Sequence, residues 1–225
     1  MISAPPTVAH RQPNSPHVVT VRPARRGFDL LRNCPLLADG FDDLDDLIAD
    51  YVDATSNKAP SDERTDAACF MDWMDDRLFL TPEEQDFVTS QRSRHTVELL
   101  AVQQRVAHLR FQHLLALREN ALPAEPLSSR ITVVINPVRV WSKFQTRALV
   151  DESTPIPATV LFVAHGTQVS QVVVTPLGES LLRLLETSGP LTISQLQRLR
   201  PQTPPNQIIQ ELHRLTIQKA LALRS

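Results

Sequence analysis

The sequence predicts an α+β fold: a helical N-terminal domain with one long helix, then a small antiparallel sheet joined to a winged-helix-like module. Three observations lead to this prediction. Apolar residues recur with the helical period as far as Leu115, valine and isoleucine dominate after a proline-bearing linker, and the last third reads helix, helix, helix, strand. We expect an arm at 1–27, a helical domain at 28–122, and a β-hairpin plus winged-helix-like domain at 128–225.

The first 27 residues are expected to form an extended or disordered arm, because prolines recur at 5, 6, 13, 16 and 23. Within the arm, "HVVTV" could pair as a short strand. A first helix is expected in "GFDDLDDLIADYVDAT", whose apolar residues share one face and whose aspartates suit the positive end of the helix dipole. A second is expected in "DERTDAACFMDWMDDRLF", anchored by Phe70, Trp73 and Met74.

The long helix is expected to begin at Thr81, which can cap it, and Pro82, which fits the first helical position. Since no breaker follows until Pro123, we expect about 35 residues and a length of roughly 50 Å. Its apolar residues form two bands, and the first two helices would cover part of them. The stripe expected to face inward is Val88, Leu99, Val102, Val106 and Leu109, and the second band is Val97, Leu100, Phe111, Leu114 and Leu115.

The segment "NALPAEPLSS" is the expected domain boundary. After it, "RITVVINPVRVWSKF" predicts two strands that are broken at Asn136-Pro137. Residues Thr159–Ala164 and Gln168–Val174 predict a hairpin around "HGT". Three segments are then candidates for an open sheet edge: Ile131–Ile135, Val138–Trp141 and Gln168–Val174.

The last third predicts a winged helix. Thr175 caps a helix that ends at Gly189-Pro190, Thr192 caps the short helix "ISQLQRL", and the helix "IIQELHRLTIQK" and the strand "ALAL" follow. This pattern makes a DNA-binding regulator one candidate function. It is weakened by a net charge of only +3 from Thr175 onward and by the absence of a hairpin wing after the last strand. The candidate recognition helix offers Asn206, Gln207, Gln210, His213, Arg214 and Lys219, but also Glu211.

Composition excludes several classes of protein. Five glycines leave no phosphate-binding glycine-rich loop, and neither the histidines nor the two cysteines show zinc-like or nucleophile–base spacing. We therefore expect no catalytic residue, no metal ligand and no cofactor in this chain. No segment has the pattern of a signal peptide or a membrane span, so a cytoplasmic protein is expected.

Charge is unevenly distributed. Between Asp39 and Asp86 there are sixteen acidic and three basic residues, a net charge of −13, although the whole chain has −2. Two interpretations stay open: a solvated acidic face, or a docking surface for a basic partner. Trp141 is equally open, because it could pack in the core or stand at a sheet edge. There, with Arg139, Lys143 and Phe144, it could hold an acidic peptide that adds to the sheet as a strand.

Several motifs resemble a known family. "ITVVINPVRVW", then a loop, then "TVLFVAHGTQVSQVVVTPLGESLLRLLE" is similar to the C-terminal half of small helper subunits that pair with TIM-barrel, multinuclear non-haem iron enzymes. These helpers (the methanobactin helper, the HvfC-type proteins and the TglI-type helper of 3-thiaglutamate biosynthesis) act in pathways that make ribosomal-peptide (RiPP) natural products. The matching features are the "PVxxW"-like strand, the hairpin, and Pro176, Gly178, Glu179, Leu182 and Leu185 of the following helix; "FMDWM" echoes a helix of the same family.

The resemblance implies a non-catalytic role in a heterodimer. The helper would bind the leader of a ribosomally made precursor peptide and present its cysteine-bearing end to the iron enzyme, which holds the metals. We expect peptide contacts from Val138, Arg139, Trp141, Lys143, Phe144, Gln168, Gln171 and Val173. Partner contacts are expected from Asp72, Trp73, Asp76 and His165. The alternatives are a DNA-binding regulator and a plain scaffold protein.

Overall fold

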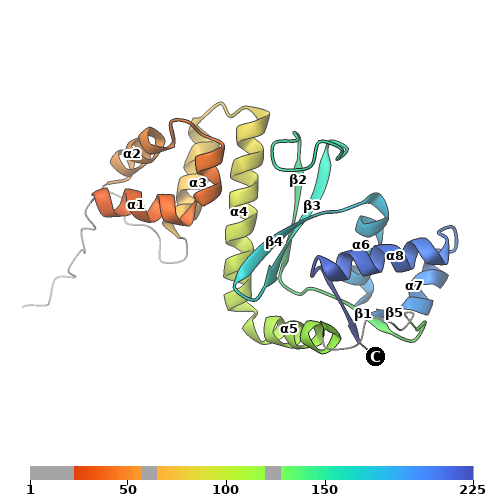
Figure 1. The fold of residues 1–225 in the computed structure, drawn as a ribbon. Helices are drawn as coiled ribbons and strands as arrows, with labels where there is room; N and C mark the ends of the chain where they lie inside the picture. The colour runs from red at the N-terminus through yellow and green to blue at the C-terminus, as the bar shows by residue number, and fades with distance from the viewer. Residues whose placement is uncertain (1–22, 57–64, 120–127, 225) are drawn as a thin grey trace, which may run out of the picture.

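The computed structural model describes residues 23–56, 65–119 and 128–224 of the chain. It is an α+β fold in which helices lead and two small antiparallel sheets follow (Figure 1). The leading helices are α1 (Pro23–Asn33), the 3-10 turn η1 (Pro35–Asp39), α2 (Leu44–Ala54), α3 (Asp66–Arg77), α4 (Pro82–Gln103) and α5 (Arg105–Glu119). The remaining elements are β1 (Thr132–Ile135), β2 (Arg139–Phe144), β3 (Ala158–His165), β4 (Gln168–Val173), α6 (Pro176–Ser188), β5 (Leu191–Thr192), α7 (Ile193–Leu199), α8 (Pro205–Ile217) and β6 (Leu221–Arg224).

Helix α1 corrects the prediction that the arm extends to residue 27. Pro23 begins this helix, because a proline at the first helical position loses no hydrogen bond. The guanidinium of Arg26 donates two hydrogen bonds, of 2.6 and 2.7 Å, to the carboxylate of Asp66 on α3, and Leu30 is buried beneath. A contact 40 residues away therefore fixes α1. The rest of the predicted arm, with "HVVTV", lies outside the described residues, as does most of the expected linker.

The two helices predicted next are confirmed as α2 and α3. Their apolar faces meet α1, η1 and α4 in one core that includes Ile48, Tyr51, Phe70, Met71 and Met74. Asp66 is half-buried there. Burial alone would raise its pKa, but the hydrogen bonds from Arg26 and Tyr51 and the charge of Arg26 hold that pKa below its usual value.

The predicted 35-residue helix is two helices. Its start is confirmed, with Thr81 and Glu84 forming a reciprocal capping box, but the helix breaks at Gln104 and α5 turns away from the axis of α4 (Figure 1). No proline or glycine lies at the break. Val97 of α4 packs on β2 and β3, whereas Phe111 and Leu115 of α5 pack on Ala222 of β6. The helix bends because its two halves cover two different sheets.

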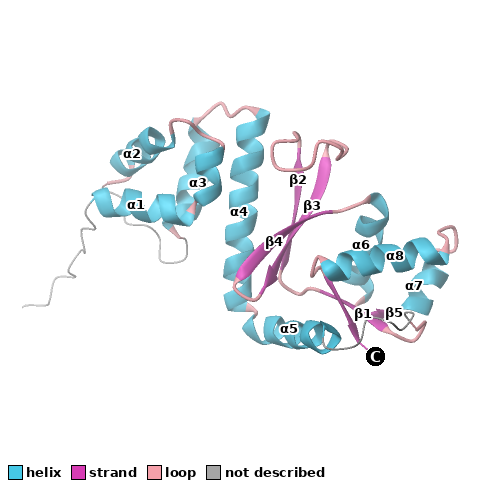
Figure 2. Ribbon diagram, in the orientation of Figure 1, coloured by secondary structure: helices cyan, strands magenta, loops and turns pink. Residues whose placement is uncertain are grey.

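Figure 2 shows the two sheets apart from each other. The first has the order β5-β1-β6 and the second the order β2-β3-β4, and all pairs are antiparallel. The prediction that Ile131–Ile135 offers an open edge is wrong, because β1 is the central strand. Its partners β5 and β6 come from about 60 to 90 residues further along the chain, and local pattern could not identify them.

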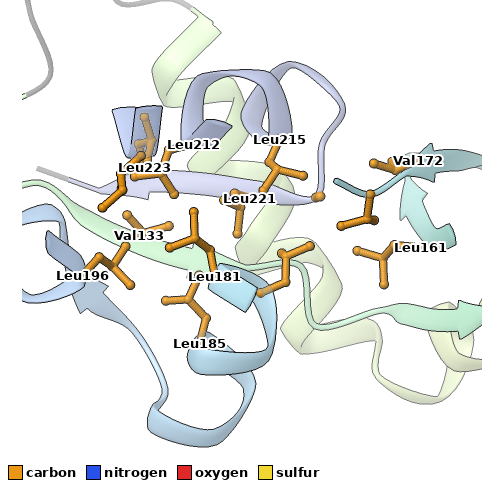
Figure 3. Close-up of a cluster of buried hydrophobic side chains, with 14 of the residues drawn as sticks. Val133, Leu161, Val172, Leu181, Leu185, Leu196, Leu212, Leu215, Leu221 and Leu223 are labelled. Atoms are coloured by element: carbon orange, nitrogen blue, oxygen red, sulfur yellow. The ribbon is translucent and has the colours of Figure 1, made fainter. Parts of the chain in front are cut away.

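The sheet β2-β3-β4 lies between two helical layers. α4 covers one face, where Ser93 contacts Ser142 through their hydroxyl oxygens at 2.6 Å and Val160 and Phe162 pack beneath Val97. On the other face, Leu161 and Val172 join the core of the winged-helix-like module. Figure 3 shows this core filled by leucines from α6, α7, α8 and β6 together with Val133 of β1.

The winged-helix-like module is confirmed, with one difference from a simple winged helix. The elements α6, α7, α8 and β6 follow in the predicted order, and the short strand β5 between α6 and α7 is an addition to the prediction. β1, which precedes them in sequence, pairs with both β5 and β6. In a winged helix, the second strand of the wing hairpin returns beside the first and takes the middle of the sheet. Here β1 takes that middle place, next to β6. Among the described helices, none is both long enough and apolar enough to cross a lipid bilayer.

Candidate functional site

The two outer strands of the β2-β3-β4 sheet are the candidate site, because both carry main-chain groups that point away from β3. In an antiparallel pair, successive residues alternate between facing the partner strand and facing outward. The amide of Ala164 donates to the carbonyl of Val138, so the even-numbered residues of β2 face β3. The main-chain groups of Arg139, Trp141 and Lys143 therefore face outward, and within the described part of the chain they have no hydrogen-bond partner.

At the β2 edge the predicted peptide-gripping side chains are already engaged. The indole N–H of Trp141 donates to Glu186 Oε1 at 2.8 Å, and Arg139 Nε donates to the same oxygen at 2.7 Å. The guanidinium of Arg183 lies 4.0 Å from the centre of the Trp141 ring. Trp141 is half-buried against the C-terminal core. The structure thus places both Arg139 and Trp141 in a cluster with α6, which an acidic peptide would have to disrupt.

Glu186 is the centre of this cluster. Burial alone would raise its pKa, but the hydrogen bonds from Trp141 and Arg139 and the charges of Arg139 and Arg183 lower that pKa below its usual value. The carboxylate therefore stays ionised near neutral pH and neutralises the charge of Arg139 on β2. Lys143 remains exposed at this edge.

Val138 and Phe144 need correction as predicted peptide contacts. Both side chains are fully buried beneath α4 and the following loop. The main-chain carbonyl of Val138 is occupied by Ala164, and its amide donates to the side chain of Asn136 at 3.0 Å. A peptide at the β2 edge would reach neither side chain.

The β4 edge is different. The amide of Val174 donates to the carbonyl of Thr159, so Val169, Gln171 and Val173 are the residues whose main-chain groups face outward. Arg214 of α8 donates to the carbonyl of Val173 at 3.0 Å and so closes the far end of the strand. Within the described residues, the outward groups of Val169 and Gln171 have no partner. Figure 1 shows β4 in front of β2 and β3, with no other element drawn over it.

The composition of β4 also distinguishes it. Edge strands are normally protected by charged side chains or proline, as Arg139 and Lys143 protect β2. β4 has the sequence "QVSQVV" and carries neither. Gln168 and Gln171 are exposed, and the Gln171 amide donates to the carbonyl of Leu149 at 2.7 Å. β4 is thus an uncharged edge with open main-chain groups.

A groove of about 440 Å³ lies beside the start of β4. The β3–β4 turn forms one wall, and the junction of α4 and α5 forms the other, with Ala101, Val102, His108, Leu109, Ala164 and Val169 among its lining residues. His108 Nε2 lies 3.3 Å from the carbonyl oxygen of Gly166 and holds the turn against α5. The surface of the groove is mostly apolar, although Glu98 and Arg105 also line it, and the groove adjoins the open part of the strand.

The predicted peptide contacts do not form one site. Gln168, Gln171 and Val173 lie on β4, whereas Arg139, Trp141 and Lys143 lie on β2, and β3 separates the two strands. One added strand could not contact both sets. Sequence reasoning missed Val169, Glu186 and Arg214, although strand alternation in "QVSQVVV" pointed to Val169. The hydrogen bonds of Arg214 to Val173 and of Arg139 to Glu186 join residues 41 and 47 positions apart and left no local signal.

The predicted partner contacts fall in two places. Asp72 pairs with Arg92 of α4 at 3.4 Å, Trp73 packs against Tyr51 and Phe70, and Asp76 is exposed on the same helix α3. His165 is the last residue of β3, next to the β3–β4 turn, whose Gly166 lines the groove together with Ala101 and other residues of α4. From Arg92 to Ala101 the helix rises about 14 Å. These residues therefore form no single cluster.

The candidate recognition helix α8 presents few cations. Arg214 pairs with buried Glu211 at 2.6 Å and also bonds the carbonyl of Val173, so it faces the protein. Asn206, Gln207, Gln210 and His213 are exposed. Within the described residues, no group of three His, Cys, Asp or Glu side chains is placed to hold a metal ion. No known family has a sequence model that matches this chain, and no curated protein is significantly similar to it.

Proposed function

We propose that this chain is the non-catalytic partner subunit of a multinuclear iron enzyme that modifies a ribosomally made peptide, as in 3-thiaglutamate-type biosynthesis. It binds the leader of the precursor peptide and presents the cysteine-bearing end to the partner, which holds the iron; both act in the cytoplasm. The observation that carries the proposal is the uncharged outer edge of β4, where the outward main-chain groups of Val169 and Gln171 have no partner among the described residues. The resemblance of the hairpin and of Pro176, Gly178 and Glu179 to helper subunits supports the identity of the pathway.

The leader adds to β4 as a further antiparallel or parallel strand. Val169 and Gln171 each offer an amide and a carbonyl, and Val173 offers its amide. At about 1 kcal/mol net for each hydrogen bond, these groups together contribute on the order of 5 kcal/mol before the cost of ordering the peptide. Main-chain pairing alone therefore gives weak binding, and side chains entering the apolar groove add to it.

A rigid edge suits this task. α4 holds one face of the sheet and the winged-helix-like core holds the other, so the edge needs no rearrangement to accept a strand. The chain contributes by raising the effective concentration of the peptide at the partner and by orienting it. A DNA-binding regulator is less favoured. Arg214 of the candidate recognition helix pairs with Glu211 and is not free for DNA, and β1 takes the position that a wing strand would have.

Proline substitution on the two edges tests the proposal. In Gln171→Pro only the outward amide of β4 is lost, because Gln171 does not bond β3 through its own amide; Lys143→Pro makes the same change on β2. Gln171→Pro should weaken binding of the fluorescently labelled precursor peptide encoded beside this gene by about tenfold. Lys143→Pro and Gln171→Ala should leave the affinity within about twofold of the wild type.

The measurements are fluorescence anisotropy with the peptide, and size-exclusion chromatography after co-expression with the neighbouring iron-binding barrel. Loss of binding in Lys143→Pro but not in Gln171→Pro would place the peptide on β2 and refute the β4 site. Absence of a barrel gene and a short precursor gene beside this one, or turnover of a peptide by the isolated chain, would refute the function itself.

A further inference from the structure

An exposed apolar stripe lies at the junction of α4 and α5. Leu99, Val102, Val106 and Leu109 recur at the helical spacing of three, four and three residues. The sequence predicts that they face inward, and this prediction is wrong: they are 39%, 76%, 64% and 56% exposed. The helices turn other residues inward at this point, namely Val97 toward the β2-β3-β4 sheet and Phe111 toward β6.

The stripe is too concentrated to be ordinary surface. Single exposed apolar side chains are common, but four within eleven residues, two on each side of the α4–α5 break, indicate an interaction surface. Val102 and Leu109 also line the groove beside the β3–β4 turn, so the two helices present the stripe on a common side.

The residues around the junction are arranged symmetrically about Gln104. Valine lies two positions before and two positions after Gln104 (Val102, Val106). Alanine lies three positions away on both sides, and leucine lies five positions away on both sides (Leu99, Leu109). At six residues stand Glu98 on one side and Arg110 on the other, which are opposite in charge. Both are exposed, and Arg110 has no ion-pair partner among the described residues, whereas Glu98 accepts from Arg94 at 3.4 Å.

We propose that this face binds a second copy of the chain through a two-fold symmetric interface centred on Gln104. A two-fold axis that runs above the exposed face, parallel to the line that bisects the angle between α4 and α5, lays α4 of one copy along α5 of the other in opposite directions. Each residue before Gln104 then faces the residue equally far beyond it. Leucine faces leucine, valine faces valine, and Glu98 faces Arg110 of the other copy, twice per dimer.

The symmetry selects a second copy over a different protein. An unrelated partner needs apolar surface, but it gives no reason for the matched valines and leucines or for opposite charges at equal distance from one residue. The patch is small beside the roughly 800 Å² per partner that a stable complex buries. The dimer is therefore weak and depends on concentration, and it requires neither peptide nor iron enzyme.

A charge swap tests the interface. Glu98→Arg alone places a second positive charge opposite Arg110, and Arg110→Glu alone places two acidic groups opposite each other. Each should raise the dimer dissociation constant about tenfold or more, because each alters two symmetry-related contacts. The double variant Glu98→Arg/Arg110→Glu restores opposite charges and should restore dimerisation. Sedimentation velocity of the full chain over a wide range of concentration measures the wild type and all three variants.

Two further variants distinguish the proposed interface from non-specific association of exposed apolar side chains. Val102→Asp should abolish the dimer, whereas Ile217→Asp, on α8 and 63% exposed, should not change it. Circular dichroism and thermal melting show that each variant is folded. A wild-type chain that is monomeric at every concentration overturns the proposal, and so does a dimer that the single charge variants leave intact or the double variant fails to restore. The dimer shares Val102 and Leu109 with the groove that peptide side chains are proposed to enter, so sedimentation is run without peptide, and its result stands whether or not a peptide binds at β4.

Discussion

At the residue scale, the ion pair of buried Glu211 and half-buried Arg214 joins the sheet to the winged-helix-like module. Glu211 accepts hydrogen bonds from Arg214 and from the Thr175 hydroxyl at 2.8 Å, and Arg214 continues to the carbonyl of Val173. Burial alone would raise the pKa of Glu211, but these hydrogen bonds and the charge of Arg214 lower that pKa below 4.5, the usual value for glutamate. The pair therefore links the stability of the fold to pH.

The direction in which stability changes with pH follows from the number of protons that the folded and unfolded chains bind. Because the folded-state pKa is below the unfolded value of 4.5, the unfolded chain binds more protons between the two values. The contribution is fully present above pH 4.5 and is lost as the pH falls through the folded-state pKa. Glu211→Gln should lower the free energy of unfolding by about 1–3 kcal/mol at pH 7. Urea denaturation across pH should show this difference shrinking below pH 4.5, and a difference independent of pH would contradict the assignment.

The residue scale also shows where sequence reasoning stops. The sequence predicts that Gln168–Val174 is a strand at a sheet edge, and β4 is indeed an outer strand of its sheet. The partner of Trp141 is not predicted, since Glu186 lies 45 residues away on another element. Alternation along a strand predicts which side chains share a face. Which residues from other elements already contact that face is visible only in the folded structure.

At the scale of elements, the close approach of α6 and α8 depends on Gly178. A Cβ there would collide with the carboxylate of Glu211 and would lie 3.2 Å from the Thr175 hydroxyl oxygen and from a Val174 methyl. Gly178→Ala should therefore lower stability by about 1–3 kcal/mol, although alanine favours a helix by up to about 1 kcal/mol. Thermal melting measures the loss. Ser180→Ala, on the same helix, should change stability by less than about 0.5 kcal/mol, and an unchanged Gly178→Ala would show that the carboxylate can move aside.

Element starts are predicted well here, and element ends and pairings are not. Thr81 and Pro82, Thr175 and Pro176, and Thr192 mark helix starts correctly, because capping is a contact within four residues. The end of α4 is set by two sheets whose strands begin well beyond α5 in the sequence, so no local signal exists at Gln104. The same cause turns the stripe of Leu99 and Val102 outward and leaves β1 in the centre of its sheet.

At the scale of the whole molecule, α4 belongs to both halves. On one side Gln91 accepts from the amide of Leu36 at 3.1 Å and donates to the carbonyl of Asn33, so it holds the turn η1. On the other side Asp86, which is 1% exposed, accepts from the amides of Gln145 and Thr146 at 2.9 and 2.7 Å and from the Thr146 hydroxyl. The expected domains 28–122 and 128–225 therefore meet along one shared helix.

Because both cores pack on α4, we expect the two halves to unfold together. Asp86→Ala removes the acceptor of two main-chain amides and should cost roughly 3 kcal/mol, since those amides lose their partner in a buried place. Differential scanning calorimetry should show a single transition in the wild type and a single transition at lower temperature in Asp86→Ala. Asp76→Ala, at an exposed position on α3, should leave the free energy of unfolding within about 0.5 kcal/mol of the wild type. The contrary result is two separate transitions in Asp86→Ala, of which only the one at higher temperature has moved relative to the wild type. That result would show that the helical half and the sheet half are stable independently, and that α4 joins them without coupling their folding.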